Sequence, residues 1–227
     1  MSAGATYEAV LFDLDGTLVD TAPDMVAALL ALMQAEGRKP LPYALARSFV
    51  SNGAAGLIGL AFPDVPRNEH DRLRHDFLDR YQAAVCVHSR LFPGLEEVLR
   101  RLDAGGVPWG VVTNKPGHLS RALLDGLGLH DRAACLVAGD TIPERKPDPA
   151  PLLLASRQTG VDPGRSVYVG DAARDIEAGK RAGMHTIAAA YGYVTGDDDP
   201  VRWDAHQIAA DTAELAHLLL KGVNLDA

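Results

Sequence analysis

The second half of the chain alternates short apolar runs with segments of helical periodicity, and this alternation constrains the fold more than any other feature. The apolar runs, which we expect to be buried strands, lie at 107–113, 135–138, 166–170 and 185–190. Segments with apolar residues at helical spacing lie at about 95–102, 119–127, 149–159 and 175–182. Such alternation is typical of a parallel sheet covered by helices on both faces. With a further apolar run at 8–13, the sequence predicts an α/β fold with a doubly wound parallel-sheet core.

The first half of the chain has a different pattern. Residues 17–90 contain no segment that is typical of a strand, and helical spacing recurs at about 23–36, within 43–62 and around 73–81. A crossover between parallel strands needs only about a dozen residues, so this insert is expected to be a separate helical unit. We therefore predict a core domain and an inserted α-helical cap domain, with the core at 1–18 and 91–227 and the cap at 19–90.

Composition narrows the choice of partner and compartment. The 227 residues carry a net charge of −8, which argues against a nucleic-acid or anionic-membrane surface. Cys86 and Cys135 are the only cysteines, so no disulfide framework is expected, and two isolated thiols suit a reducing cytoplasm. Neither a signal peptide nor a membrane-spanning segment is apparent in the sequence. We expect a cytoplasmic protein whose partner is a small molecule, and the sequence leaves monomer and homodimer both open.

Two carboxylates follow the first expected strand. Asp13 and Asp15 are two residues apart, so in an extended strand both side chains point to the same face. At about 4 Å and an effective dielectric constant of about 20, their repulsion costs about 4 kcal/mol. A cation between them, or a proton on one of them, removes this cost. Taken alone, the pair is equally compatible with a polar turn.

Other polar residues follow the later strands. Thr113 and Asn114 come after the run at 107–113, Lys146 comes after the third strand, and Asp171 ends the run at 166–170. In an open parallel sheet, the carboxyl ends of the strands share one edge, where ligands bind. Carboxylates, a hydroxyl, an amide and a lysine at one edge suit phosphoryl transfer assisted by Mg²⁺.

The order and spacing of these motifs resemble those of the haloacid dehalogenase-like phosphatases. The four motifs are Asp13-Leu14-Asp15-Gly16-Thr17, Val112-Thr113-Asn114, Lys146-Pro147-Asp148-Pro149 and Gly170-Asp171 with Asp175. Within that superfamily the chain resembles the phosphoglycolate phosphatase group, and it is similar to bacterial N-acetylmuramic acid 6-phosphate phosphatases. The segments that carry these two likenesses are His88–Phe92, Trp109–Pro116, Tyr191-Gly192-Tyr193 and Asp199-Pro200 with Trp203.

The resemblance implies a Rossmann-like core, a helical cap and Mg²⁺ as cofactor, and it assigns roles to the motif residues. Asp13 would be the nucleophile, and Asp15 would be the general acid and then the general base. Mg²⁺ would be held by Asp13, the main-chain carbonyl of Asp15 and Asp171, with Asp175 as a more distant or water-mediated ligand. The phosphate would be bound by Thr17, Thr113, Asn114 and Lys146.

Several alternatives remain open at this stage. Lys115 is as compatible with a solvent-exposed side chain as with a site residue, and Arg47 is more typical of a surface arginine. The leading hypothesis is a phosphatase similar to phosphoglycolate phosphatases. The alternatives are an N-acetylmuramic acid 6-phosphate phosphatase, a phosphosugar mutase and a non-enzymatic receiver-like module. We expect the cap to choose the substrate through its small-residue loop at 52–56, although Ala55 offers no positive charge there.

Overall fold

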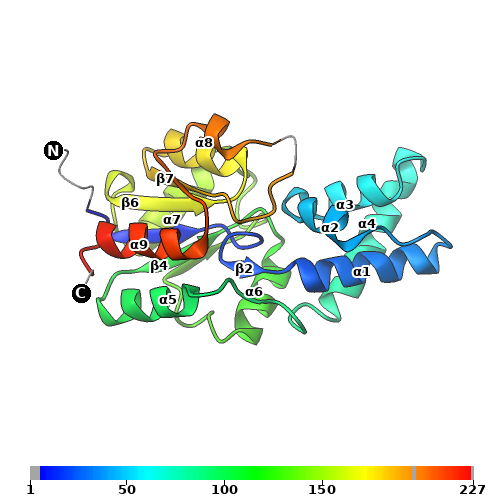
Figure 1. Ribbon diagram of the computed structural model, residues 1–227, viewed down its shortest axis with the longest axis horizontal. Coiled ribbons are helices and arrows are strands. Elements are labelled where there is room, and N and C mark those ends of the chain that lie inside the picture. Colours follow the sequence, from blue (N-terminus) through cyan, green and yellow to red (C-terminus); the bar gives the residue numbers. More distant parts are fainter. Residues whose placement is uncertain (1–5, 196–197, 226–227) are drawn as a thin grey trace.

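A six-stranded sheet forms the centre of the larger domain in the computed structural model, which describes residues 6–195 and 198–225 (Figure 1). The strand order is β5-β4-β1-β6-β7-β8, and every pairing is parallel. The strands are β1 Ala9–Phe12, β4 Trp109–Val112, β5 Cys135–Val137, β6 Ser166–Gly170, β7 His185–Ala189 and β8 Gln207–Ala209. The predicted parallel α/β fold is confirmed.

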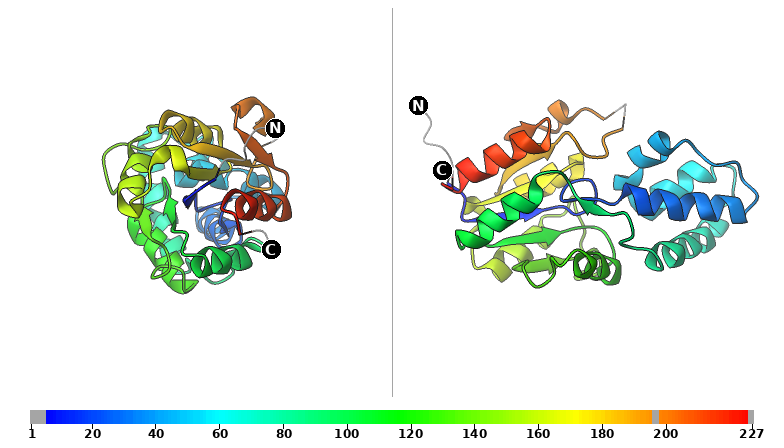
Figure 2. Two further views of the ribbon diagram at one scale, coloured as in Figure 1. Left: turned by 90° about the vertical axis from the view of Figure 1, so that its left-hand side faces the viewer. Right: turned by 60° about the horizontal axis from the view of Figure 1, so that its bottom comes forward.

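Helices cover both faces of the sheet, because side chains of successive strand residues point to opposite faces. On one face of the sheet, Val10 and Phe12 pack in an apolar cluster with a first set of helices. On the other face, Leu11 packs in a second apolar cluster with a second set. The first set is α5 Leu95–Ala104, α6 Gly117–Gly126 and α9 Thr212–Gly222. The second set is α7 Ala150–Thr159 and α8 Ala173–Arg181. The end-on view in Figure 2 shows helices on both sides of the sheet.

A helical bundle lies beyond the carboxyl ends of the strands, at the right of Figure 1. It contains α1 Ala22–Ala35, α2 Tyr43–Ser48, the 3₁₀ turn η1 Val50–Asn52, α3 Gly53–Ala61 and α4 Arg67–Gln82. Its interior is apolar, and its fully buried side chains include Leu29, Leu32, Leu57 and Phe77. We call this bundle the cap. The proposed domain limits at 18/19 and 90/91 remain a proposal.

The two connections between the cap and the core pair with each other. Val19–Asp20 (β2) and Arg90–Leu91 (β3) form a short antiparallel ladder, so the expectation of no strand within 17–90 is wrong. Strands of two residues show no periodicity that a sequence pattern could reveal. Nearby, the buried carboxylate of Asp24 accepts hydrogen bonds from the backbone N–H groups of residues 87–89 at 2.8–3.0 Å. The return segment is thereby fixed to the first turn of α1.

Two smaller elements complete the core. Strand β8 was not predicted, since it has three residues and only Ala209 is buried. The 3₁₀ turns η2 Pro163–Arg165 and η3 Pro200–Trp203 precede β6 and β8. Across residues 6–195 and 198–225, no helix is both long enough and apolar enough to span a bilayer.

Candidate active site

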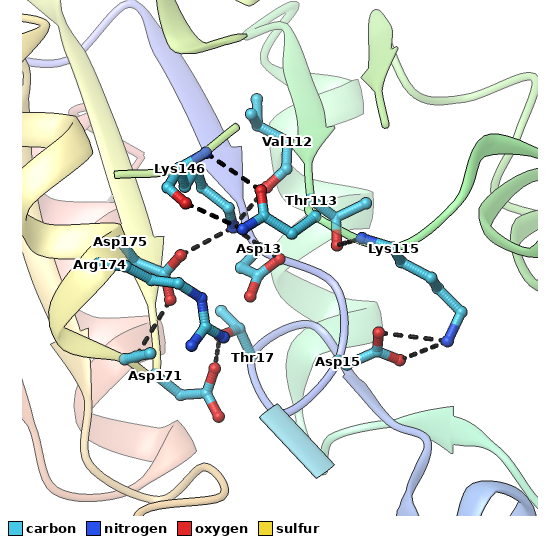
Figure 3. Close-up of polar contacts among 12 residues, drawn as sticks. Asp13, Asp15, Thr17, Val112, Thr113, Lys115, Lys146, Asp171, Arg174 and Asp175 are labelled. Carbon is cyan, nitrogen blue, oxygen red and sulfur yellow. Dashed lines mark hydrogen bonds and ion pairs between the residues drawn. The ribbon is translucent and has the colours of Figure 1, made fainter. Parts of the chain in front are cut away.

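The polar residues that follow the strands converge where the core faces the cap (Figure 3). Asp13 follows β1, Thr113 follows β4 and Asp171 follows β6. Strand β1 lies between β4 and β6, so these three residues come from adjacent strands. The sheet edge expected from the sequence is therefore assembled in the structure.

Lys146 is the buried cation at the centre of this edge. Its Nζ lies 2.9 Å from Asp13 Oδ1 and 2.7 Å from Asp175 Oδ1, and its side chain is only 1% exposed. The same ammonium donates hydrogen bonds to the carbonyl of Val112 at 3.0 Å and to the hydroxyl of Tyr168 at 2.8 Å. These contacts balance the cost of burying a charge. The neighbouring Arg145 is exposed, so Lys146 is the residue that meets Asp13.

Three buried carboxylates form a compact cluster beside Lys146. One oxygen from each of Asp13, Asp171 and Asp175 lies within 4.8 Å of the others. Burial, followed by the charges of Asp13 and Asp175, raises the pKa of Asp171 to about 7, and burial also raises the pKa of Asp175. Asp13 Oδ1 and Asp175 Oδ1 accept no hydrogen bond within the described residues, although both lie near Lys146.

This donor set fits a magnesium ion. Hard divalent cations take carboxylate oxygens as ligands, and a cation would offset the repulsion among the three carboxylates. The cluster contains Asp175 itself, which the sequence placed farther out, and it does not contain the side chain of Asp15. The main-chain carbonyl of Asp15 stays a predicted ligand.

The loop after β1 approaches the cluster closely because it contains Gly16. This residue has φ +84°, and a Cβ built on it would lie 2.2 Å from Asp171 Oδ2. The next residue, Thr17, donates its hydroxyl to Asp171 Oδ1 at 3.2 Å. Thr17 therefore orients a carboxylate of the cluster, and its predicted contact with phosphate stays a prediction.

Thr113 and Asn114 hold the turn after β4. Thr113 Oγ1 accepts the N–H of Lys115 at 3.2 Å, which leaves its hydroxyl hydrogen able to donate. The amide of Asn114 donates to the carbonyl of Lys146 at 3.0 Å and accepts its N–H at 3.1 Å. Asn114 thus joins the second motif to the third, a positioning contact beyond its predicted role toward phosphate.

Lys115 is a buried site residue, which decides the alternative left open by the sequence. Its Nζ lies 3.0 Å from Asp15 Oδ1 and 3.0 Å from the hydroxyl of Tyr81, on α4 of the cap. Burial alone would lower the pKa of Lys115, but the carboxylate of Asp15 and the hydroxyl of Tyr81 raise it above its ordinary value. Asp15 also accepts a hydrogen bond from Thr21 at 2.6 Å. Asp15 is therefore oriented by groups separate from those around Asp13.

A cavity of about 470 Å³ lies between the cap and the strand ends. Asp13, Asp15 and Lys115 line its core side, and the cap contributes the loop 50–55 and one face of α4. Within that loop, the hydroxyl of Ser51 donates to Asp171 Oδ2 at 2.6 Å. The main-chain carbonyl of Ser51 accepts a hydrogen bond from the guanidinium of Arg174 at 2.6 Å. The cap therefore touches the carboxylate cluster directly.

Two residues considered in the sequence lie outside this cavity. Arg47 contacts Asp20 at 3.9 Å, and its guanidinium lies over the ring of Tyr193 at 4.7 Å. His88 uses its backbone N–H to bind Asp24. The contacts of Tyr81 and Asp24 were not predicted from the sequence. The only sequence signal of Tyr81 is its place on an amphipathic helix, and that of Asp24 is its place in the first turn of a helix.

The fold and these strand-end residues define a class of hydrolases. Residues 10–189 match the model of the haloacid dehalogenase-like hydrolase family, and the chain belongs to that family. Its relatives are named as phosphatases, and the protein is a phosphoric monoester hydrolase.

Two relatives differ in the substrate that their names give. The chain is 44% identical to a phosphoglycolate phosphatase of Xanthomonas campestris pv. campestris (strain 8004), over 91% of this chain and 94% of that protein. It is 43% identical to the N-acetylmuramic acid 6-phosphate phosphatase of Pseudomonas aeruginosa, over 93% and 94% of the two chains. A crystal structure of a predicted phosphoglycolate phosphatase from Haemophilus somnus 129PT matches with a TM-score of 0.83 and 28% identity. That match covers 93% of this chain and 97% of the other.

Proposed function

We propose that the protein is a Mg²⁺-dependent phosphatase that hydrolyses a small phosphorylated metabolite through an aspartyl-phosphate on Asp13. The observation that carries this proposal is the cluster of three buried carboxylates beside Lys146, of which Asp13 lines the cavity between the core and the cap. The names of the two relatives give phosphoglycolate and N-acetylmuramic acid 6-phosphate as the candidate substrates.

In the first step, an oxygen of Asp13 forms a bond to phosphorus while the bond from phosphorus to the ester oxygen breaks. Lys146 orients Asp13 and supplies positive charge beside the transferring group. Thr113 donates its hydroxyl to a phosphoryl oxygen. The leaving oxygen receives a proton from Asp15, which lines the same cavity.

In the second step, water attacks the phosphorus of the aspartyl-phosphate and gives a proton to Asp15, so that phosphate leaves and the carboxylate of Asp13 is restored. Asp13, Asp171 and the carbonyl of Asp15 would hold Mg²⁺, with Asp175 beside them. When bound, the ion supplies positive charge that offsets repulsion between the carboxylates and the phosphate.

The test is Asp13→Asn, assayed on an aryl phosphate with Mg²⁺. We expect turnover to fall to background while the thermal unfolding transition is kept, and wild-type protein quenched during turnover to gain the mass of one phosphoryl group. Asp125→Asn, which changes an exposed carboxylate on α6, serves as the control. Turnover by Asp13→Asn within a few-fold of wild type would refute the mechanism. A comparison of kcat/KM on phosphoglycolate and N-acetylmuramic acid 6-phosphate identifies the substrate.

A further inference from the structure

One face of α4 forms the cap wall of the cavity. Four of its residues line the cavity, namely Arg74, Phe77, Leu78 and Tyr81. Their spacing of three, four and seven residues places them on one face of the helix. The face is therefore a strip with a cation at one end, two apolar side chains in the middle and a phenol at the other end.

The phenol end of the strip marks the reaction centre. The hydroxyl of Tyr81 lies 3.0 Å from Lys115 Nζ, which in turn lies 3.0 Å from Asp15, the predicted proton donor to the leaving oxygen. An α-helix rises about 1.5 Å per residue, so Arg74 begins about 10 Å farther along the strip. Side chains lean toward the helix N-terminus, and because both residues lean the same way their separation along the strip is kept. A leaving group that starts at Asp15 must be long to reach Arg74.

The guanidinium of Arg74 has no partner within residues 6–195 and 198–225, and its side chain is exposed. Its neighbour Arg72, by contrast, is paired with Glu36, Glu69 and Asp76. Across the cavity, Arg145 of the core is another exposed guanidinium without a partner among the described residues. Arg74 therefore brings an unneutralised positive charge to the cap wall of the cavity, although the chain as a whole is acidic.

We propose that Arg74 binds a carboxylate of the leaving group, and that the substrate is a sugar-sized phosphate ester whose carboxylate lies several bonds away from the ester oxygen. The proposal rests on the proposed phosphatase function and deepens it. Glycolate carries its carboxylate next to the carbon that bears the phosphate, so it is too short for the strip. The lactyl carboxylate of N-acetylmuramic acid 6-phosphate is attached through O3 of the sugar and the phosphate through O6, so it lies much farther from the ester oxygen than the carboxylate of glycolate does. Leu78, which is partly exposed, packs against the body of such a leaving group, and the buried ring of Phe77 supports the helix face from behind.

The experiment compares two esters that differ by one group. N-Acetylmuramic acid 6-phosphate and N-acetylglucosamine 6-phosphate share the sugar and the phosphate, but only the first has the lactyl carboxylate. The quantity measured is the ratio of their kcat/KM values for wild type, Arg74→Gln and Arg80→Gln. Arg80 is an exposed arginine on the same helix that does not line the cavity, so it controls for the loss of one positive charge.

Wild type is expected to prefer the lactyl ester, and Arg74→Gln is expected to lower the ratio about 10-fold, chiefly through KM. A 10-fold change corresponds to the lower end of the free energies found for hydrogen bonds to charged groups. We expect the lower end because Arg74 is exposed. Arg80→Gln should keep the wild-type ratio. The proposal is overturned if the two variants have equal ratios, or if wild type prefers phosphoglycolate. If wild type hydrolyses no phosphate ester, the phosphatase function itself is wrong, and this inference is wrong with it.

Discussion

Replacing Lys115 by methionine tests the interpretation that the buried charge of this residue helps to hold the cap on the core. Lys115 and Asp15 are 4% and 14% exposed, and their closest atoms are 3.0 Å apart. Removing one partner of a buried ion pair costs about 3–5 kcal/mol. Since Asp15 faces a cavity that water enters, we expect a loss of about 2–3 kcal/mol in the free energy of unfolding. For a chain of this length that loss lowers the melting temperature by about 4–12 °C.

The pH dependence of this loss follows from the raised pKa of Lys115. A lysine whose pKa is higher in the folded protein stabilises it fully below the ordinary lysine value of about 10.4. The contribution is lost as pH rises through the higher folded value. The difference between wild type and Lys115→Met should therefore be constant from pH 6 to 9 and should shrink above about pH 10.

The assay is urea unfolding of wild type, Lys115→Met, Tyr81→Phe and the double variant. Tyr81→Phe removes the hydroxyl that accepts from Lys115, and it should cost about 1 kcal/mol in wild type and almost nothing in Lys115→Met. Lys221→Met, at an exposed position of α9, should change stability by less than about 0.5 kcal/mol. Equal stabilities of Lys115→Met and Lys221→Met, or full additivity in the double variant, would refute the reasoning.

Three further predictions concern the metal, the glycine loop and acid stability. Burial raises the pKa of Asp171 to about 7, so the metal-free protein should lose stability as pH rises through 7. The gain in melting temperature on adding Mg²⁺ should therefore be larger at pH 8 than at pH 6. Asp171→Asn should abolish this difference between the two pH values. Gly16→Ala should reduce stability by at least about 1–2 kcal/mol in urea unfolding and remove activity. Gly37 also has a positive φ, but a Cβ added there would meet open space. Gly37→Ala should therefore show only the cost of placing alanine at positive φ. Burial, and then the charge of His206 stacked at 4.5 Å, lowers the pKa of His185. The contribution of His185 to stability is therefore present above about pH 6.5 and lost as pH falls. His185→Gln should flatten the profile of stability against pH between about pH 6.5 and 5, and an unchanged slope would contradict this assignment.

The core was predictable because its signals are local. The alternation of apolar runs and helical spacing predicted the parallel sheet, and strand periodicity placed Asp13 and Asp171 at one edge. Such patterns depend only on neighbouring residues, so they are readable before the chain is folded.

The missed features depend on contacts between distant segments. Lys115 follows a turn, and nothing near it in the sequence shows that α4 covers it with Tyr81. Tyr81 itself belongs to an apolar strip that is typical of helix packing. The positive charge that the cap loop lacks lies instead at Arg74 on α4, a helix whose sequence pattern shows only its apolar spacing.

The contact between Ser51 and Asp171 makes the position of the cap and the charge of the cluster thermodynamically linked. The hydroxyl of Ser51 lowers the pKa of Asp171 because it donates to the ionised carboxylate. Linkage is reciprocal, so ionisation of Asp171 must favour the cap position that brings Ser51 to it by the same free energy. A ligand that binds this carboxylate therefore also shifts the equilibrium between positions of the cap. The cap can thus change position when the carboxylate cluster is occupied, before any leaving group contacts it.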